Sequence, residues 1–163
     1  MANVTRLHPE LRAGDVLVGD RAFGTYAYRY FLVDHGLHGV FRMSQRRVVD
    51  FTPGRSPPPR WNTGKLTGKT RSRWVRNLGP TDQVVEWYKP YQRQSWMTAE
   101  AYAALPVTLA VRETQYAVNR PGFRVGTVTL VSTLPDETAY AYPAGALAEL
   151  YRQRWQVETD LAT

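Results

Sequence analysis

The chain has 163 residues and no cysteine, which excludes disulfide bonds, thiolate metal sites and a thiol nucleophile. It also lacks any apolar run near the roughly 20 residues that a membrane-spanning helix needs. The polar stretch after Met1 does not resemble a signal peptide. We therefore expect a cytoplasmic protein of one domain, or of one domain with an insertion, that is long enough to bury a core.

The patterns of several enzyme classes are missing as well. Ser44 and Ser72 have no nearby His/Asp partner pattern, so a hydrolase triad is unsupported. Residues 64–70, GKLTGKT, resemble a phosphate-binding loop only superficially, because no buried strand precedes them. His35 and His38 flank a predicted helix end and look like turn residues rather than metal ligands.

Positive charge is what the chain has in excess, and the excess is local. The net charge is +7, yet residues 42–76 alone hold eight Arg and two Lys against one acid, a balance of +9. The 11 basic and 13 acidic residues elsewhere give −2. Aromatic residues interleave these charges: Phe41, Phe51, Trp61 and Trp74. This pattern favours a nucleic-acid-binding segment over the alternative, a solvated basic loop.

The first third of the chain predicts a compact α/β unit. Residues 16–18 form a short apolar run bounded by turn residues, which indicates a buried strand. Residues 25–35 have helical periodicity and begin with a capping threonine, and residues 38–43 form a second apolar run. A strand, a helix and a strand at this spacing favour two parallel strands.

The middle of the chain predicts antiparallel strands. Pro and Gly residues separate the apolar or alternating runs, and residues 119–122 look like a hairpin connection. The strand candidates are residues 47–51, 72–78, 83–88, 107–118 and 123–134. We therefore divide the chain into a core over residues 14–45, a β-rich insertion over 46–134, and a final helix over 143–163.

The final helix carries two charged residues on its apolar side. At about 100° per residue, one arc is apolar: Leu147, Leu150, Tyr151, Trp155, Val157 and Leu161. Arg154 and Glu158 fall near the centre of this arc, one turn apart. They form either an i,i+4 ion pair on a partly buried face or part of a functional site.

Asp20 directly follows the strand predicted at residues 16–18. Ligands of α/β sheets bind at the carboxyl ends of strands, although a loop aspartate also caps turns. Together with Glu158, it offers carboxylate oxygens on rigid elements, which hard divalent cations prefer.

These segments resemble bacterial insertion-sequence DDE transposases. Residues 14–23, GDVLVGDRAF, are similar to that family's second catalytic-aspartate motif. Tyr151, Arg154 and Glu158 match its third-acid signature, which is Tyr, two residues, Arg, three residues, Glu, six residues, Lys. The order of the motifs also agrees: second acid, long β-rich insertion, glutamate helix. The resemblance implies an α/β fold, part of a ribonuclease-H-like domain interrupted by an antiparallel β-rich insertion.

The resemblance also implies a chemistry. Asp20 and Glu158 would be catalytic and would bind Mg²⁺ or Mn²⁺ for phosphodiester cleavage and strand transfer. Tyr151 and Arg154 would contact DNA phosphate near the cleaved end. The resemblance further implies a dimeric complex with transposon ends in the bacterial nucleoid. The basic segment would supply further contacts with the DNA backbone through Arg46, Arg47, Arg71 and Arg73. Trp61 or Trp74 would stack on an extruded base.

Two departures from the family pattern set further expectations. The family's first catalytic aspartate lies on an earlier strand, and the signature lysine would fall beyond Thr163. We therefore expect an internal piece of a transposase with little or no strand-transfer activity on its own. Two alternatives remain: a non-enzymatic nucleic-acid-binding β-rich module, and a different metal-dependent nuclease of the same fold.

Overall fold

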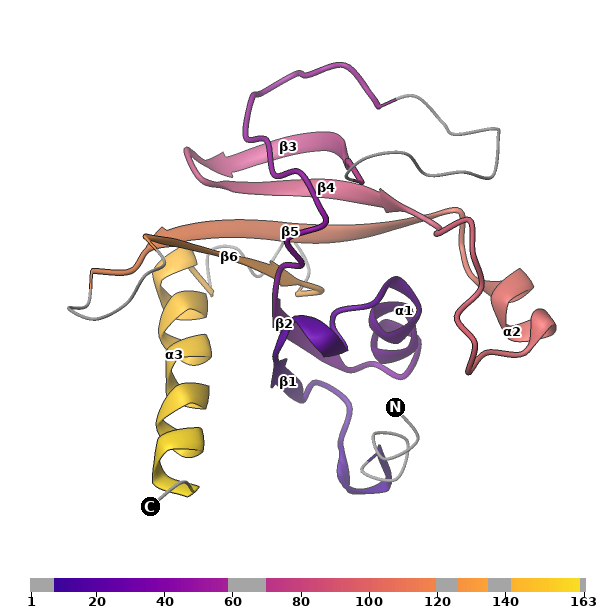
Figure 1. The fold of residues 1–163 in the computed structure, drawn as a ribbon, viewed down its shortest axis with the longest axis horizontal. Coiled ribbons are helices and arrows are strands. Elements are labelled where there is room, and N and C mark those ends of the chain that lie inside the picture. Colours follow the sequence, from indigo (N-terminus) through magenta and orange to yellow (C-terminus); the bar gives the residue numbers. More distant parts are fainter. Residues whose placement is uncertain (1–7, 59–69, 120–125, 135–141, 162–163) are drawn as a thin grey trace.

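The computed structural model describes residues 8–58, 70–119, 126–134 and 142–161, with the backbone alone for residues 8 and 155–161. Six strands form one mixed sheet (Figure 1) in the order β1-β2-β6-β5-β4-β3. The strands are β1 (Val16–Gly19), β2 (His38–Arg42), β3 (Arg73–Gly79), β4 (Asp82–Tyr88), β5 (Thr108–Ala117) and β6 (Thr127–Ser132). The helices are α1 (Tyr26–Asp34), α2 (Ala99–Ala104) and α3 (Ala144–Leu161), with short 3₁₀ turns η1 (His8–Glu10) and η2 (Arg21–Phe23).

The predicted strand-helix-strand unit is confirmed. β1 and β2 are parallel, and α1 connects them. Thr25 caps α1, because its Oγ1 accepts the backbone N–H of Tyr28 at 3.3 Å. Gly36 follows the helix with φ +68°, a conformation that glycine adopts without strain. These two residues set where the helix begins and where the chain turns back into β2.

Most predicted strands of the middle segment are confirmed, and one is wrong. β3, β4, β5 and β6 pair antiparallel in succession. Residues 47–51, by contrast, form only an isolated bridge between Arg47 and Thr70. The carbonyls of Asp50 and Phe51 accept hydrogen bonds from the side chains of Gln83 and Asn77 instead. The side-chain amides thus form hydrogen bonds with backbone carbonyl groups that a neighbouring strand would otherwise pair.

The strands of the middle segment continue the sheet that β1 and β2 begin. β6 pairs antiparallel with β2, with Phe41 opposite Val131. The segment also contains α2, which the sequence analysis did not predict; Thr98 caps it through the backbone N–H of Ala101 at 3.1 Å. The strands of the proposed core and of the proposed insertion therefore belong to one continuous sheet. The division of the chain into core and insertion stays a prediction.

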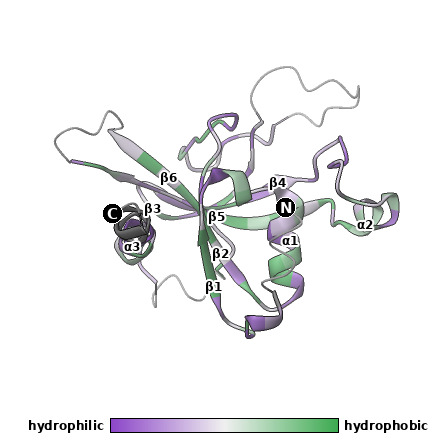
Figure 2. Cartoon of the chain, turned by 60° about the horizontal axis from the view of Figure 1, so that its bottom comes forward, coloured by the Kyte–Doolittle hydropathy of each residue, from purple (hydrophilic) through white to green (hydrophobic). Residues whose placement is uncertain are grey.

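The sheet separates two hydrophobic clusters. Adjacent residues of a strand point to opposite faces, so Phe41 packs in one cluster with α1 while Val40 packs in the other with α3. β1 is hydrophobic over Val16–Val18, as the green colouring in Figure 2 shows, and contributes to both clusters. Among the described helices, none is both long and apolar enough to cross a membrane.

The burial of Tyr26 predicts a loss of stability at alkaline pH. Its hydroxyl donates to the carbonyl of Pro106 at 2.7 Å, and burial, with Glu86 nearby, raises the pKa of Tyr26 to about 12. Because this folded-state pKa exceeds the ordinary 10.0, the unfolded chain loses its proton first. The contribution is fully present below pH 10 and is lost as the pH rises through about 12.

We expect Tyr26→Phe to lose less stability than the parent chain over this pH range. The measurement is the urea unfolding midpoint at several pH values between 10 and 12. Burial also raises the pKa of Tyr28, so the variant keeps part of the slope. Identical slopes in the two proteins would contradict the assignment to Tyr26.

Candidate functional site

Asp20 lies where the predicted site requires it, at the carboxyl end of β1. The half-buried side chain caps η2, and its Oδ1 accepts the backbone N–H of Arg21 at 2.6 Å. This hydrogen bond orients the carboxylate at the end of a strand that is parallel to β2. Asp20 therefore caps a turn, as one interpretation of the sequence expected, and its position at a strand end keeps the ligand-binding interpretation as a proposal.

Helix α3 packs across the same part of the sheet. It contacts β1, β2 and β5, and it runs alongside the sheet in Figure 1. Leu147 and Tyr151 are almost fully buried, each about 1% exposed, as the apolar arc predicts. Arg152 and Gln153 lie on the exposed side of the helix.

The hydroxyl of Tyr151 marks the point where these elements meet. Burial raises the pKa of Tyr151, Arg154 and Arg42 lower it, and Asp20 raises it. Helix α3 contacts β1 and β2, and the charges of Asp20 at the end of β1 and of Arg42 at the end of β2 act on this hydroxyl across those contacts. Asp20 and Tyr151 therefore belong to elements that pack against each other.

Arg154 lies on the same side of α3 as Tyr151. Its Nη1 donates to the Tyr151 hydroxyl at 3.4 Å, and its guanidinium carbon lies 5.7 Å from the centre of the tyrosine ring. The side chain is half-buried rather than fully enclosed. A guanidinium is a group that suits a phosphate or a carboxylate.

Glu158 follows Arg154 by four residues in α3, but its side chain lies outside the described residues. Its place in the site therefore rests on the helix backbone alone. Asp20 supplies the carboxylate oxygens that Mg²⁺ and Mn²⁺ prefer, so the chemistry of this donor fits such a cation. Within the described part of the chain, no three His, Cys, Asp or Glu residues gather closely enough to hold a metal ion.

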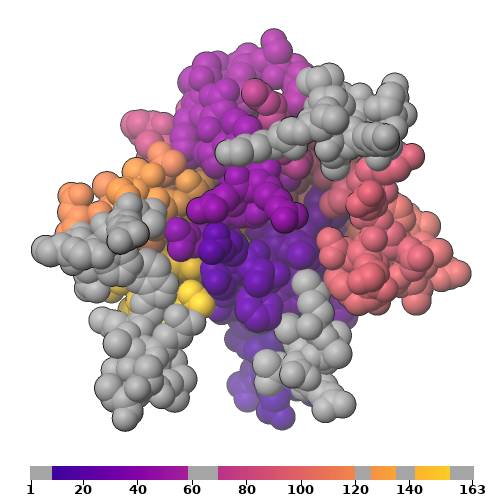
Figure 3. Space-filling view, in the orientation of Figure 1, coloured from indigo at the N-terminus to yellow at the C-terminus, as the bar shows by residue number. Residues whose placement is uncertain are grey.

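The predicted DNA-binding arginines have different surroundings. Arg46 and Arg71 are exposed, Arg46 before the bridge to Thr70 and Arg71 just after it. Arg73 is exposed on β3, at the edge of the sheet, where it forms an ion pair with Glu86 on β4. Figure 3 shows the segment that follows β2, in purple to magenta, spread over the surface of the upper half of the molecule.

The two predicted stacking residues also differ. Trp74 on β3 is half-buried, and its Nε1 donates to Oδ1 of Asn77 at 2.5 Å. Trp61 lies outside the described residues. A stacking role for either side chain stays a prediction.

Arg47 points inward instead of toward solvent. Its guanidinium carbon lies 3.5 Å from the ring centre of Trp87, and its Nη2 is buried without a hydrogen-bond partner. Burial lowers the pKa of Arg47 to about 10, although Glu113 opposes the shift. We therefore leave Arg47 out of the proposed DNA contacts.

A buried polar cluster beneath Arg47 was not foreseen from the sequence. Glu113, 1% exposed, accepts Trp87 Nε1 at 3.0 Å and Gln83 Nε2 at 2.8 Å. Burial raises the pKa of this carboxyl group, and the two hydrogen bonds oppose the shift. Arg29, also 1% exposed, lies with its guanidinium carbon 4.1 Å from the ring centre of Trp87.

One signal in the sequence indicates that Arg29 is buried. Arg29 stands three residues after Tyr26 and three before Leu32, which places it on the apolar face of α1. Its Nε and Nη1 are buried without hydrogen-bond partners, and burial holds the pKa of Arg29 well below its ordinary value. No comparable signal marks Glu113, because both faces of β5 are buried at that point.

Comparison with known proteins adds one positive finding. Residues 3–163 match the model of a protein family described as transposase DDE domain. A search of curated proteins gave no match. The matched region contains Asp20 and the whole of α3.

Proposed function

Because this chain belongs to the transposase DDE domain family, we propose that its sheet and last helix bind DNA and place it for metal-dependent cleavage and strand transfer. The mixed six-stranded sheet with three helices is compatible with part of a ribonuclease-H-like fold. The observation that carries the proposal is the packing of α3, which holds Tyr151 and Arg154, against β1, which Asp20 follows directly. A bacterial insertion sequence as the source is part of the same proposal.

Asp20 and Glu158 are the proposed cation-binding carboxylates. When Mg²⁺ or Mn²⁺ is bound, such a site activates water or a 3′-hydroxyl and stabilises the leaving oxygen. The backbone N–H of Arg21 holds Asp20 at the strand end, so its carboxylate need not reorganise on binding. The rigid helix α3 carries Glu158.

Tyr151 and Arg154 are proposed to position the DNA phosphate beside Asp20. The Tyr151 hydroxyl accepts from one guanidinium nitrogen of Arg154, which limits the orientations of that side chain. The planar guanidinium of Arg154 matches the geometry of phosphate oxygens. Arg42, near the same hydroxyl, adds positive charge to this region.

Arg46, Arg71 and Arg73 are proposed to contact the DNA backbone farther from the reaction. Arg46 and Arg71 are exposed, whereas Arg73 has to exchange its Glu86 partner for a phosphate. Trp74 and Trp61 are the candidates for base stacking, Trp61 on sequence grounds alone. The family resemblance further leads us to propose a homodimer that acts on transposon ends in the bacterial nucleoid.

DNA affinity is expected to depend steeply on salt. Each phosphate contact releases counterions, so affinity for a DNA duplex falls strongly between roughly 50 and 200 mM salt. Arg46→Gln and Arg71→Gln each reduce the slope of log affinity against log salt by about 1. Fluorescence anisotropy with a labelled duplex measures both effects.

The matched control is Arg12→Gln, which removes an exposed arginine before β1, away from the proposed contacts. Its slope stays that of the parent chain. If affinity stays flat across the salt range, or if Arg12→Gln lowers the slope as much as the other variants, the assigned surface is wrong.

A binding module without catalysis is the second candidate. It is favoured by the exposure of Arg46 and Arg71 in the basic segment, because binding of a DNA backbone needs no acidic site. Mg²⁺-dependent cleavage of DNA that disappears in Asp20→Ala would favour the catalytic candidate over the binding module.

A further inference from the structure

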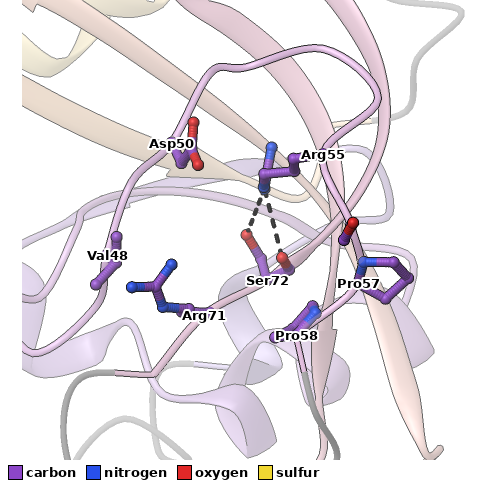
Figure 4. A pocket seen from close by; sticks show the side chains of 8 residues that line it. Val48, Asp50, Arg55, Pro57, Pro58, Arg71 and Ser72 are labelled. Atoms are coloured by element: carbon purple, nitrogen blue, oxygen red, sulfur yellow. Dashed lines mark hydrogen bonds between the residues drawn. The ribbon is translucent and has the colours of Figure 1, made fainter.

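A pocket opens between residues 48–58 and the chain just before β3. Its volume is about 290 Å³, at the lower end of the range for small-molecule sites. Charged and apolar side chains share the lining: Asp50, Arg55, Arg71, Val48, Pro57 and Pro58. Figure 4 shows Asp50, Val48 and Arg71 on one side of the pocket and the two prolines on the other.

Two buried side chains hold the guanidinium of Arg55 in place. Its Nη1 donates to Oε1 of Gln83 at 3.1 Å, and its Nη2 donates to Oγ of Ser72 at 3.1 Å. Both partners are almost fully buried, Gln83 at 0% and Ser72 at 3% exposed. An arginine has five N–H donors, so Arg55 keeps donors for a ligand while its orientation is fixed.

The carboxylate of Asp50 is fixed at the pocket rim. Its Oδ1 accepts the backbone N–H of Thr52 at 2.9 Å, and its backbone carbonyl accepts Nε2 of Gln83 at 2.9 Å. Hydrogen bonds from Thr52, with Arg55 and Arg71 nearby, lower the pKa of Asp50. The pocket therefore presents an ionised acceptor beside two cationic donors at neutral pH.

We propose that this pocket binds an unpaired guanine base. Guanine presents two donors, N1–H and the N2 amino group, next to two acceptors, O6 and N7. The donors match the carboxylate of Asp50, and the acceptors match the guanidinium of Arg71. Pro57 and Pro58 give the flat ring an apolar wall.

The other bases do not fit this arrangement. Adenine and cytosine turn a ring-nitrogen lone pair toward the carboxylate where guanine has N1–H. Thymine flanks its single ring N–H with two carbonyl oxygens, which the carboxylate repels. A buried or half-buried carboxylate that loses its donors is costly, so the mismatch weakens binding.

The guanine has to be unpaired, because cytosine occupies N1–H and N2 in duplex DNA. Its source is either a single-stranded stretch of DNA or a free guanine nucleotide. If the guanine belongs to single-stranded DNA, the inference rests on the proposed DNA-binding function and deepens it. Arg71 then contacts the edge of a base in place of a phosphate. The free-nucleotide source does not depend on that function.

The test uses oligothymidylates that carry one central guanine, hypoxanthine or adenine, with the full chain and fluorescence anisotropy as readout. We expect guanine to bind about tenfold more tightly than adenine, with hypoxanthine, which lacks the N2 amino group, between them. Asp50→Asn removes the preference, although its amide oxygen still accepts the Thr52 N–H. The matched control Asp34→Asn, on exposed α1 surface, keeps the preference.

Arg71→Gln provides a second variant on an exposed side chain, and it also reduces the preference for guanine. Competition with guanosine monophosphate separates the two sources. If that nucleotide binds in an Asp50-dependent manner while no oligonucleotide binds, the pocket is supported and the proposed DNA-binding function fails.

If all oligonucleotides bind equally and guanosine monophosphate does not compete, the guanine site is wrong and DNA binding stands. A preference for guanine that survives Asp50→Asn overturns the assignment to this pocket. Thermal unfolding of each variant establishes that it is folded.

Discussion

Asp82→Ala is expected to destabilise the fold by about 3–5 kcal/mol, because it leaves the buried charge of Arg112 without its partner. Arg112 Nε and Nη2 donate to the two carboxylate oxygens of Asp82 at 2.8 and 2.6 Å. The side chain of Arg112 is only 2% exposed and that of Asp82 only 10%. Thr114 Oγ1 also donates to Asp82, at 3.0 Å. Since small domains are stable by about 5–15 kcal/mol, this is a large share of the total.

A double variant provides the control for this prediction. Asp82→Ala combined with Arg112→Met removes both charges, so it is less destabilised than Asp82→Ala alone. The free energy of unfolding from urea titration measures the difference. A single variant within about 1 kcal/mol of the parent chain would show that the pair is not effectively buried.

Local sequence signals predicted the elements that short-range chemistry specifies. Thr25 and Gly36 mark the two ends of α1, and the apolar runs that became β1 and β2 pair as the α/β pattern requires. The long alternating strands β5 and β6 were equally clear. Helix α2 carries the same kind of signal, since Thr98 precedes a run of good helix formers.

Long-range packing decided the features that the sequence did not reveal. Residues 47–51 have the composition of a strand, yet the amides of Gln83 and Asn77 bind their carbonyls from β4 and β3. Arg47 lies between aromatic residues in the sequence, a pattern shared by DNA-binding surfaces and by buried cation–π contacts. Only the position of Trp87 shows that the contact is buried.

The sequence proposes the members of the candidate site, but it does not predict the packing of the elements that carry them. Fixed spacing singled out Tyr151 and Arg154 on one helix, and the strand end singled out Asp20. Their convergence depends on α3 packing over β1, a contact between segments more than a hundred residues apart. The pocket beside Asp50 had no signal, because Arg55 is held by Gln83 on β4 and by Ser72 just before β3, which are 28 and 17 residues away in the sequence.

Removing either proposed cation ligand is expected to produce the largest functional loss. Asp20→Asn and Glu158→Gln keep the size of each side chain but remove its negative charge. Changes to residues that only orient a metal ligand typically cost 10–100-fold in affinity, so loss of a ligand itself should cost more than about a hundredfold. The fold is expected to persist, because the amide oxygen that Asp20→Asn introduces still accepts the Arg21 N–H.

Binding of Mn²⁺ to the parent chain and to these two variants, followed by electron paramagnetic resonance, tests the central claim most directly. The claim is that Asp20 at the end of β1 and Glu158 on α3 belong to one cation site. We expect saturable Mn²⁺ binding by the parent chain and its loss in both variants, with binding retained in the control Asp34→Asn. No saturable binding by the parent chain, or undiminished binding in either variant, would contradict it.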